Sequence, residues 1–318
     1  MVRTFSAETK GELIREVPEA RHCQIAELAA ILSLCGNVVI DVRGAMSLKI
    51  RTENEFVARK CFTLLKKTFS IKAETAVRRN HETGYTSYCV GIASDASARR
   101  VLSATKILGH DGEIQTEEDI VRNTVVKQSC CRRAFLRGAF LAAGSISDPK
   151  KSYHFEIVCP SHQKAEQVIR LMETFGTEPK CTVRKKAWVV YLKEGNQIVD
   201  ILNVMGAHCA LMDMENIRIL KGMRNDVNRK VNCEAANIHK TVSAAVKQGE
   251  DIAYIKEKKG MDFLPETLKE AAEARLMRPA ASLKELGEMM KPPVGKSGMN
   301  HRLRKIGMIA DDLREGKI

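Results

Sequence analysis

Two stretches of the sequence, CQIAELAAILSLCG at residues 23–36 and CRRAFLRGAFLAAG at residues 131–144, share one pattern and lie 108 residues apart (23 to 131). Each reads as an apolar helix that ends at a glycine. In the second stretch, small residues recur at every fourth position, at Ala134, Gly138 and Ala142. This spacing places them on one face of a helix. Without bulky side chains on that face, two helices can approach until their backbones nearly touch.

The similarity between the two segments continues beyond these helices. The run Val77-Arg78-Arg79 matches Val183-Arg184-Lys185, so both copies carry the same basic strand end. Each copy is predicted to run helix, strand pair, helix, strand pair, helix. A duplicated unit of this length predicts two similar half-domains facing each other, whereas the alternative is a chance alignment of amphipathic stretches. The predicted strands are 37–42, 48–51, 73–79, 87–92, 145–147, 154–158, 181–186 and 188–193.

The C-terminal part of the chain has a wholly helical pattern from Ala235 onward. Ser282 followed by Glu285 is a capping-box arrangement, and Ser297 is placed to cap the last helix. The apolar Met299, Leu303 and Ile306 are predicted to face inward. The candidate helices are 236–247, 250–259, 265–277, 283–290 and 298–306.

The last predicted helix presents a polar and basic face. Two helices joined by a short turn, the second displaying Asn300, His301 and Arg304, are typical of a helix-turn-helix that enters the major groove of DNA. No acidic residue lies between Glu288 and Asp311, which reduces repulsion from phosphates. The alternative is an amphipathic hairpin with a solvated basic face. The candidate DNA-binding residues are Lys296, Ser297, Asn300, His301, Arg302, Arg304 and Lys305.

The overall charge agrees with a nucleic-acid partner but does not require one. The chain of 318 residues has 52 lysines and arginines against 39 acidic residues, a formal net charge of +13. A net positive charge of this size favours binding to a polyanion such as nucleic acid. The sequence has no apolar run of eighteen residues, so no membrane span is predicted, and the polar start MVRTFSAETKGELIREV is not typical of a secretory leader. A cytoplasmic location is expected.

The cysteines do not form a recognisable metal motif. Ten are present without Cys-x-x-Cys spacing, and several, such as Cys61 and Cys159, have apolar neighbours. We predict that nearly all are reduced core residues, since cysteine is among the most buried residue types. Cys130 and Cys131 adjoin, and adjacent thiols rarely bridge. The eight histidines are also dispersed, so neither a metal site nor a cofactor is predicted.

The paired glycine-ended helices resemble the two motif helices of LAGLIDADG homing endonucleases. That resemblance implies that the helices pack at a pseudo-twofold axis and that an acid before each terminal glycine holds the metals for cutting DNA. Here those positions are Cys35 and Ala143. A thiol is too soft a ligand for Mg²⁺, and a methyl group has no donor atom. We therefore expect the scaffold without its catalytic residues, and no enzyme.

The whole chain is similar to the WhiA family. The most specific residues are the terminal SLKELGEMMKPPVGKSGMNHRLRKI and the run NRKVNCEAAN from Asn228 to Asn237. The resemblance implies an α+β fold of duplicated LAGLIDADG-like αββαββα halves, followed by an all-α helix-turn-helix domain similar to region 4 of sigma factors. It also implies a nucleoid-associated transcription regulator that binds promoter DNA and acts in cell division, chromosome segregation and, in spore formers, sporulation. RNA polymerase or a cell-division component is a further candidate partner.

The expected domains follow from this reading. They are an N-terminal helical segment (1–20), a first repeat (21–110), a second repeat (111–209), a linker (210–235) and the helix-turn-helix domain (236–318). Basic residues at matching strand positions, and two in the linker, are candidates for contacting the DNA backbone, although a solvated face is the alternative. These candidates are Lys72, Arg78, Arg79, Arg184, Lys185, Lys186, Arg229 and Lys230.

Two other functions stay open at this point. One is an adaptor that binds a division or transcription partner through the repeats, and DNA binding that survives removal of residues 280–318 would favour it. The other is an active homing endonuclease, against which Cys35 and Ala143 argue.

Overall fold

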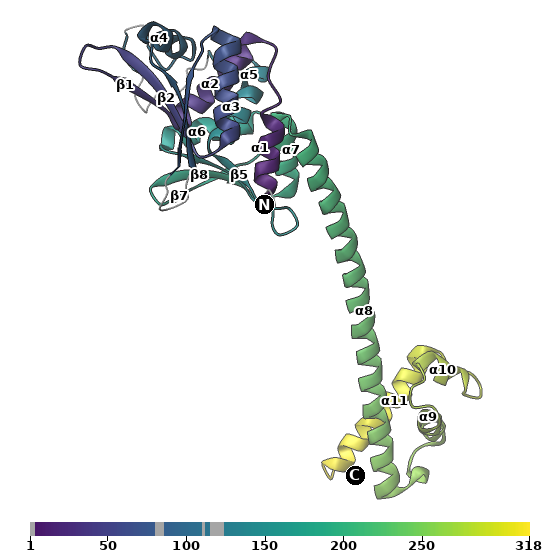
Figure 1. Ribbon diagram of the computed structural model, residues 1–318. Helices are drawn as coiled ribbons and strands as arrows, with labels where there is room; N and C mark the ends of the chain where they lie inside the picture. Colours follow the sequence, from purple (N-terminus) through teal and green to yellow (C-terminus); the bar gives the residue numbers. More distant parts are fainter. Residues whose placement is uncertain (1–3, 80–85, 110–111, 115–123) are drawn as a thin grey trace. The chain divides into compact units, whose positions relative to one another are not determined.

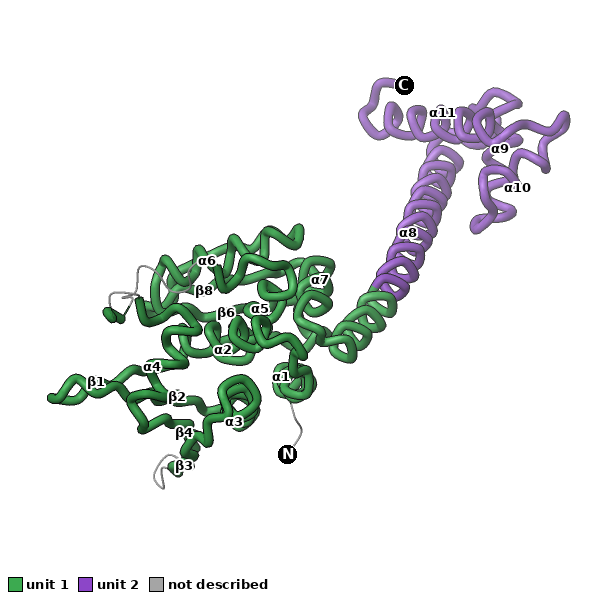
Figure 2. Tube along the Cα trace, turned by 90° about the horizontal axis from the view of Figure 1, so that it is seen from above, with its two compact units in different colours: residues 1–221 green, residues 222–318 purple. Residues whose placement is uncertain are grey.

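The chain divides into two compact units, an N-terminal unit of residues 1–221 and a C-terminal unit of residues 222–318 (Figure 2). The structure is a computed structural model that describes residues 4–79, 86–109, 112–114 and 124–318. The boundary that we expect between the two repeats, at residues 110 and 111, lies outside the described residues.

The N-terminal unit contains the same series of elements twice (Figure 1). The series confirms the predicted duplication and all eight predicted strands to within two residues at each end. After α1 (Phe5–Leu13), the first copy comprises α2 (Arg21–Cys35), β1 (Gly36–Ile40), β2 (Met46–Thr52), α3 (Glu55–Phe69), β3 (Glu74–Arg79), β4 (Thr86–Ile92) and α4 (Asp95–Ala104). The second copy comprises α5 (Ser129–Ala143), β5 (Gly144–Ile146), β6 (Phe155–Cys159), α6 (His162–Glu173), β7 (Lys180–Arg184), β8 (Ala187–Leu192) and α7 (Gly195–Met205).

Each copy forms a four-stranded antiparallel sheet. The strand orders are β1-β2-β4-β3 and β5-β6-β8-β7, so the two topologies are equivalent. Side chains alternate between the faces of a strand, and in β2 Leu48 and Ile50 are buried whereas Lys49 and Arg51 are exposed. One face of each sheet therefore covers the apolar core and the other is open. β3 and β7 are edge strands that are exposed along their whole length.

The two motif helices, α2 and α5, lie side by side at the centre of the N-terminal unit (Figure 1). A side chain at Gly138 of α5 would overlap the backbone carbonyl oxygen of Glu27 and would lie 3.0 Å from the Cβ of Ala30. Only glycine allows the two backbones to come this close. Gly138, the middle residue of the small-residue stripe, thus has the predicted role.

A buried ionic group joins these helices to α3. The carboxylate of Glu27, which is fully buried, lies 2.9 Å from Lys60 Nζ and 3.2 Å from Arg137 Nε. Lys60 also donates to the carbonyl oxygen of Leu13 at 3.2 Å, and Arg137 donates to that of Met205 at 3.1 Å. Burial lowers the pKa of Lys60, and the charge of Glu27 opposes that shift. We call Glu27, Lys60 and Arg137 the buried triad.

The ten cysteines are free and fall into three groups by burial, of which Cys35 and Cys89 form the half-buried one. Cys23, Cys61, Cys131 and Cys159 are buried, in agreement with the prediction. The prediction that nearly all belong to the core is wrong for Cys130, Cys181, Cys209 and Cys233, which are exposed. These four occupy a helix start, an edge strand and α8, where apolar neighbours in the sequence do not ensure burial.

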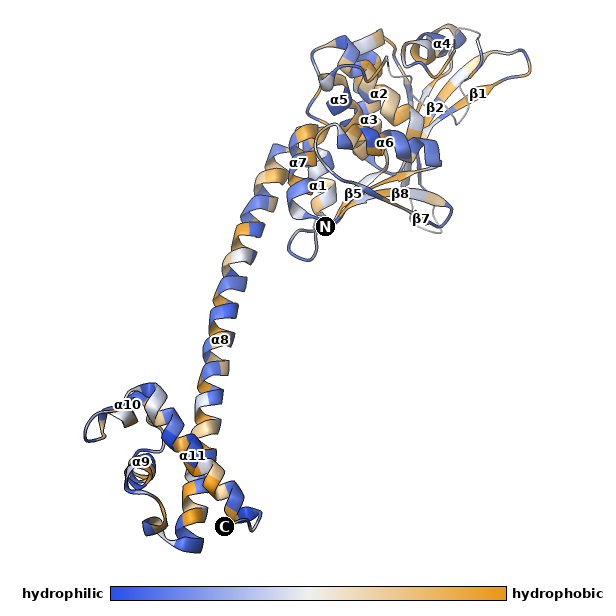
Figure 3. Cartoon of the chain, turned by 180° about the vertical axis from the view of Figure 1, so that it is seen from behind, coloured by the Kyte–Doolittle hydropathy of each residue, from blue (hydrophilic) through white to orange (hydrophobic). Residues whose placement is uncertain are grey.

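A single helix, α8 (His208–Lys259), connects the two units. The predicted linker at 210–235 is part of it, and so are the helices predicted separately at 236–247 and 250–259. The segment contains no proline, and asparagine costs a helix no more than about 0.7 kcal/mol relative to alanine. Residues 222–244 are all exposed, and hydrophobic and hydrophilic turns alternate along the helix (Figure 3).

The C-terminal unit packs the end of α8 and η1 (Met261–Phe263) with α9 (Glu266–Met277), α10 (Leu283–Glu288) and α11 (Lys296–Arg314) around a core of its own. The capping box is confirmed, because the Ser282 N–H donates to Glu285 Oε2 at 2.7 Å and the Glu285 N–H to Ser282 Oγ at 3.3 Å. The predicted cap by Ser297 is wrong, since α11 begins earlier and Gly295 is its N-cap. Among the described residues, no helix combines the length and the apolar character that crossing a membrane requires.

Candidate nucleic-acid interface

The first candidate surface is the outer face of α11. Met299, Leu303 and Ile306 are buried against the other helices of the unit, as predicted, so the opposite side of α11 faces solvent. Six of the seven residues predicted to bind DNA are exposed there: Lys296, Ser297, Asn300, His301, Arg304 and Lys305. We call these six the α11 face.

Arg302 is the exception. Its side chain is only 23% exposed, its Nη1 donates to the carbonyl oxygen of Thr267 at 3.3 Å, and it lies 3.9 Å from the carboxylate of Glu270. Both partners belong to α9. Arg302 therefore positions α11 on α9 and does not lie on the α11 face.

Gly287 fixes the turn between α10 and α11. The Val294 N–H donates to the carbonyl oxygen of Gly287 at 2.9 Å, which closes the connector against α10. A side chain at Gly287 would overlap the carbonyl oxygen of Val294. The orientation of α11 relative to α10 thus depends on the absence of a Cβ at this position.

The second candidate surface lies along the edges of the two sheets. The turn from β7 to β8 consists of Lys185 and Lys186, whose φ angles of 49° and 66° are uncommon for residues other than glycine. Arg184 is partly neutralised by Glu156, whose carboxylate lies 3.4 Å from it. The predicted backbone-contacting residues of the repeats are exposed on or beside β3 and β7: Lys72, Arg78, Arg79, Arg184, Lys185 and Lys186. Arg229 and Lys230 are exposed on α8 in the C-terminal unit, so the candidates form separate sets in the two units.

The sequence reading missed two basic residues on the open face of the first sheet. Lys49 and Arg51 alternate with buried residues along β2, and with Arg78 they line a pocket of about 350 Å³ that also contains Glu74. The alternation of apolar and basic residues from 46 to 52 is the signal that could have identified them.

The two positions that carry metal-binding acids in endonucleases lie at the ends of α2 and α5. Cys35 Sγ donates to the carbonyl oxygen of Ile31 at 3.1 Å, and burial raises the pKa of this thiol to about 12. Ala143 lines a pocket of about 790 Å³ together with the ammonium-bearing Lys10. Burial lowers the pKa of Lys10 to about 8, while the nearby Cys35 opposes that shift.

Acidic residues are also present around this pocket, since Glu53 and Glu55 line it. Glu55 is engaged with Arg59 at 2.6 Å. Within the described part of the chain, no three carboxylates or other ligand groups converge at this pocket. At the two motif positions themselves, Cys35 and Ala143 supply no carboxylate.

Comparison with known families agrees with these features. Three family models match consecutive parts of the chain: the WhiA N-terminal LAGLIDADG-like domain at residues 21–116, the WhiA LAGLIDADG-like domain at 132–224 and the WhiA C-terminal HTH domain at 227–310. The chain belongs to the WhiA family.

Individual WhiA proteins align with nearly the whole chain. The probable cell division protein WhiA of Lachnoclostridium phytofermentans is 50% identical over 314 residues, which are 98% of this chain and 100% of the relative. The proteins of the same name from Thermoanaerobacter pseudethanolicus and Clostridium perfringens (strain 13 / Type A) are 48% and 46% identical, with at least 98% of each chain covered. The crystal structure of full-length DUF199/WhiA from Thermatoga maritima has the same fold, with a TM-score of 0.59 and 24% identity over 97% of this chain and 98% of that one.

Proposed function

We propose that this WhiA-family chain is a sequence-specific DNA-binding transcription regulator that acts at the nucleoid in cell division, does not cut DNA and has no enzymatic activity. The observation that carries the proposal is the α11 face, which is exposed on a helix-turn-helix whose inner side is buried. The relatives are named probable cell division proteins, which supports the proposed role in cell division. We also propose roles in chromosome segregation and, in spore formers, in sporulation.

Recognition would rest on α11 in the major groove of promoter DNA. Asparagine pairs with adenine and arginine with guanine through two hydrogen bonds each, so Asn300 and Arg304 are the candidates for reading bases. Lys296 and Ser297 lie in the first turn of α11, where free N–H groups and the helix dipole favour a phosphate. Lys305 would add a further phosphate contact.

The basic edges of the N-terminal unit would add affinity without sequence preference. Contacts from lysine and arginine to phosphates release counterions and make binding depend strongly on salt. Lys49, Arg51 and Arg78 share one open sheet face with Glu74, and Glu156 partly neutralises Arg184 on the second sheet, so acidic side chains offset part of the basic charge on both.

An adaptor role is the second candidate function. The matching residues Val77 and Val183 are 64% and 56% exposed on the edge strands β3 and β7. An exposed edge strand has unpaired backbone groups to which another protein can add a strand. RNA polymerase or a cell-division component is the proposed partner for such a surface.

Replacing Arg304 with alanine is expected to reduce discrimination between a promoter site and random DNA by about 1–3 kcal/mol, because one bidentate base contact is lost. The measurement is a gel shift on promoter fragments from the source genome, with and without Mg²⁺. Lys258→Ala, which removes an exposed charge from the end of α8, is the matched control. Unchanged discrimination in Arg304→Ala would refute the readout role, and cleaved DNA in the presence of Mg²⁺ would refute the loss of catalysis.

Replacing Arg78 and Arg79 together with alanine is expected to weaken binding to promoter and random DNA equally. The slope of log affinity against log salt should fall by about 0.9 for each phosphate contact removed. Fluorescence anisotropy across a salt series measures this slope. The control pair Lys66→Ala and Lys67→Ala removes two exposed charges from α3. If both pairs leave the slope unchanged, the edge strands do not contact DNA and the adaptor role gains support.

A further inference from the structure

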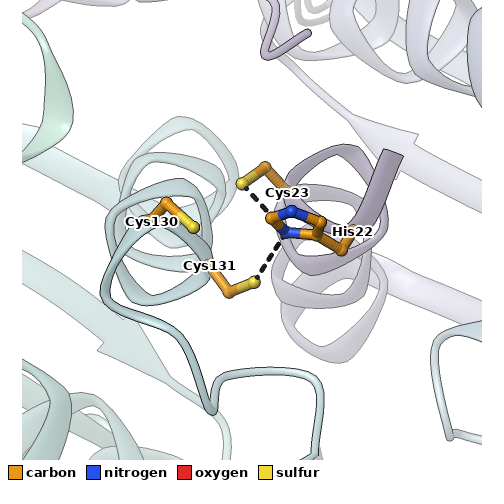
Figure 4. A group of neighbouring side chains, drawn as sticks. All are labelled: His22, Cys23, Cys130 and Cys131. Carbon is orange, nitrogen blue, oxygen red and sulfur yellow. Dashed lines mark hydrogen bonds between the residues drawn. The ribbon is translucent and has the colours of Figure 1, made fainter. Parts of the chain in front are cut away.

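Four side chains with ligand atoms for soft metals meet where α2 and α5 begin (Figure 4). His22 and Cys23 lie in the first turn of α2, and Cys130 and Cys131 lie in the first turn of α5. Their ligand atoms all lie within 4.8 Å of one another. The Nδ1 atom of His22 is 3.2 Å from Cys131 Sγ and 3.3 Å from Cys23 Sγ.

This spacing fits a tetrahedral ion. With Zn–S bonds of about 2.3 Å and Zn–N bonds of about 2.0–2.1 Å, neighbouring ligand atoms of a zinc site are separated by about 3.4–3.8 Å. The four atoms thus need only small side-chain rotations to surround one ion. Cys23 and Cys131 are buried whereas His22 and Cys130 are exposed, so the ion can enter from solvent.

The duplication explains why the ligands occur in pairs. His22 and Cys130 occupy equivalent positions of the two motif helices, as do Cys23 and Cys131. The pseudo-twofold relation of α2 and α5 therefore brings two ligands from each copy to one point. The sequence expectation of no metal site overlooked this arrangement, because each half contributes only two adjacent ligands and neither half has a spaced motif.

The helix ends contribute a positive potential at this point, whereas burial opposes the charged form of the thiols. Neither helix has an acidic residue in its first turn, and neither has a side-chain hydrogen bond at its N-cap. No acid of the first turn therefore offsets the positive end of either helix dipole, and a helix N-terminus stabilises a thiolate. Without a cation, burial and the neighbouring thiols raise the pKa of Cys23 to about 12. A bound divalent ion reverses this effect, because a coordinating thiol is deprotonated outright.

We propose that His22, Cys23, Cys130 and Cys131 form a structural Zn²⁺ site that joins the two repeats at the start of their central helices. Three sulfurs and one imidazole exclude hard ions such as Mg²⁺, and a closed set of four protein ligands is typical of structural zinc. Binding converts three thiols to thiolates and releases three protons to solvent. The site lies at the opposite end of the helix pair from Cys35 and Ala143, roughly 18–20 Å along the helix axis at a rise of about 1.5 Å per residue.

The test uses the full chain, kept reduced with a phosphine that does not compete for metal. It is freed of metal by a chelator and titrated with Co²⁺, whose thiolate complexes absorb visible light. We expect one Co²⁺ per chain, displaced by one Zn²⁺, and a higher melting temperature with Zn²⁺ than without it. Cys130→Ser removes an exposed ligand without disturbing the core and should weaken binding by more than the roughly 10–100-fold that a supporting group outside the ligand set contributes.

Cys181→Ser is the matched control, since Cys181 is an exposed cysteine of the same unit outside the cluster. It should bind Co²⁺ as the unsubstituted chain does. Reduced chain that takes up no stoichiometric metal, or equal binding by Cys130→Ser and the unsubstituted chain, overturns the proposal. Mass spectrometry that finds a disulfide within the cluster and no metal in chain purified without reductant would also count against it.

Discussion

Replacing Glu27 with glutamine is expected to lower the free energy of unfolding of the N-terminal unit by about 3–5 kcal/mol. The substitution keeps the size of the side chain but removes its charge. Lys60 and Arg137 would then be two buried cations without an anion, and burial of unpaired charge is costly. The expected loss is a large part of the total stability of a typical domain.

Urea denaturation can measure this effect with an intrinsic reporter. The single tryptophan of the chain, Trp188, lies in β8 of the same unit, so its fluorescence follows the unfolding of that unit. Glu166→Gln is the control, because Glu166 is 45% exposed and its pairing with Arg170 contributes no more than about 1 kcal/mol.

A second substitution tests the cause. Adding Lys60→Met to Glu27→Gln removes one of the stranded cations and should restore part of the lost stability. If the double variant is less stable than Glu27→Gln alone by the full cost of Lys60→Met, the charges of the buried triad are independent and this explanation fails.

Replacing Gly287 with alanine is expected to destabilise the C-terminal unit by about 3 kcal/mol, at the upper end of the usual cost of overpacking. The added methyl group would overlap a backbone carbonyl, that of Val294, which cannot rotate away as a side chain could. Either the connector or α10 must move, and α11 would lose its orientation. Binding to promoter DNA should fall together with stability if α11 reads the site.

Hydrogen exchange of the α10 and α11 amides measures the loss of packing directly. Gly295→Ala is the matched control in the same connector, since a Cβ there meets no atom within 4 Å. It replaces glycine at the N-cap of α11 and should cost less than about 1 kcal/mol. Equal protection of α10 and α11 in the two variants would contradict the role assigned to Gly287.

The sequence predicted the features that depend on local periodicity. The eight strands follow from alternation and from the repetition of one copy in the other, and the inner side of α11 follows from the spacing of Met299, Leu303 and Ile306. The close approach of α2 and α5 could also be predicted from the sequence, because small residues at every fourth position of an apolar helix leave room for a second helix on that face.

The features that the sequence did not reveal depend on contacts between distant residues. Glu27 and Arg137 read as ordinary charged positions of a helix, and their pairing appears only when the two copies pack. Arg302 shares the basic character of its neighbours, but its rotation around α11 turns it toward α9. Two ligands at 22–23 and two at 130–131 suggest a metal only after the helices are placed together.

Because α8 is one continuous helix, its exposed middle is where we expect local unfolding of the chain. Residues 222–244 of this helix are exposed, and among the described residues none forms a hydrogen bond or ion pair with them from outside the helix, so the helix's own hydrogen bonds protect their amide hydrogens. Transient fraying there requires no disruption of either hydrophobic core, because the two cores lie before and after this stretch of sequence. A protease that cleaves this stretch would therefore release two folded fragments. The rate of this first cleavage would depend on the stability of one solvated helix and not on the free energy of unfolding of the protein.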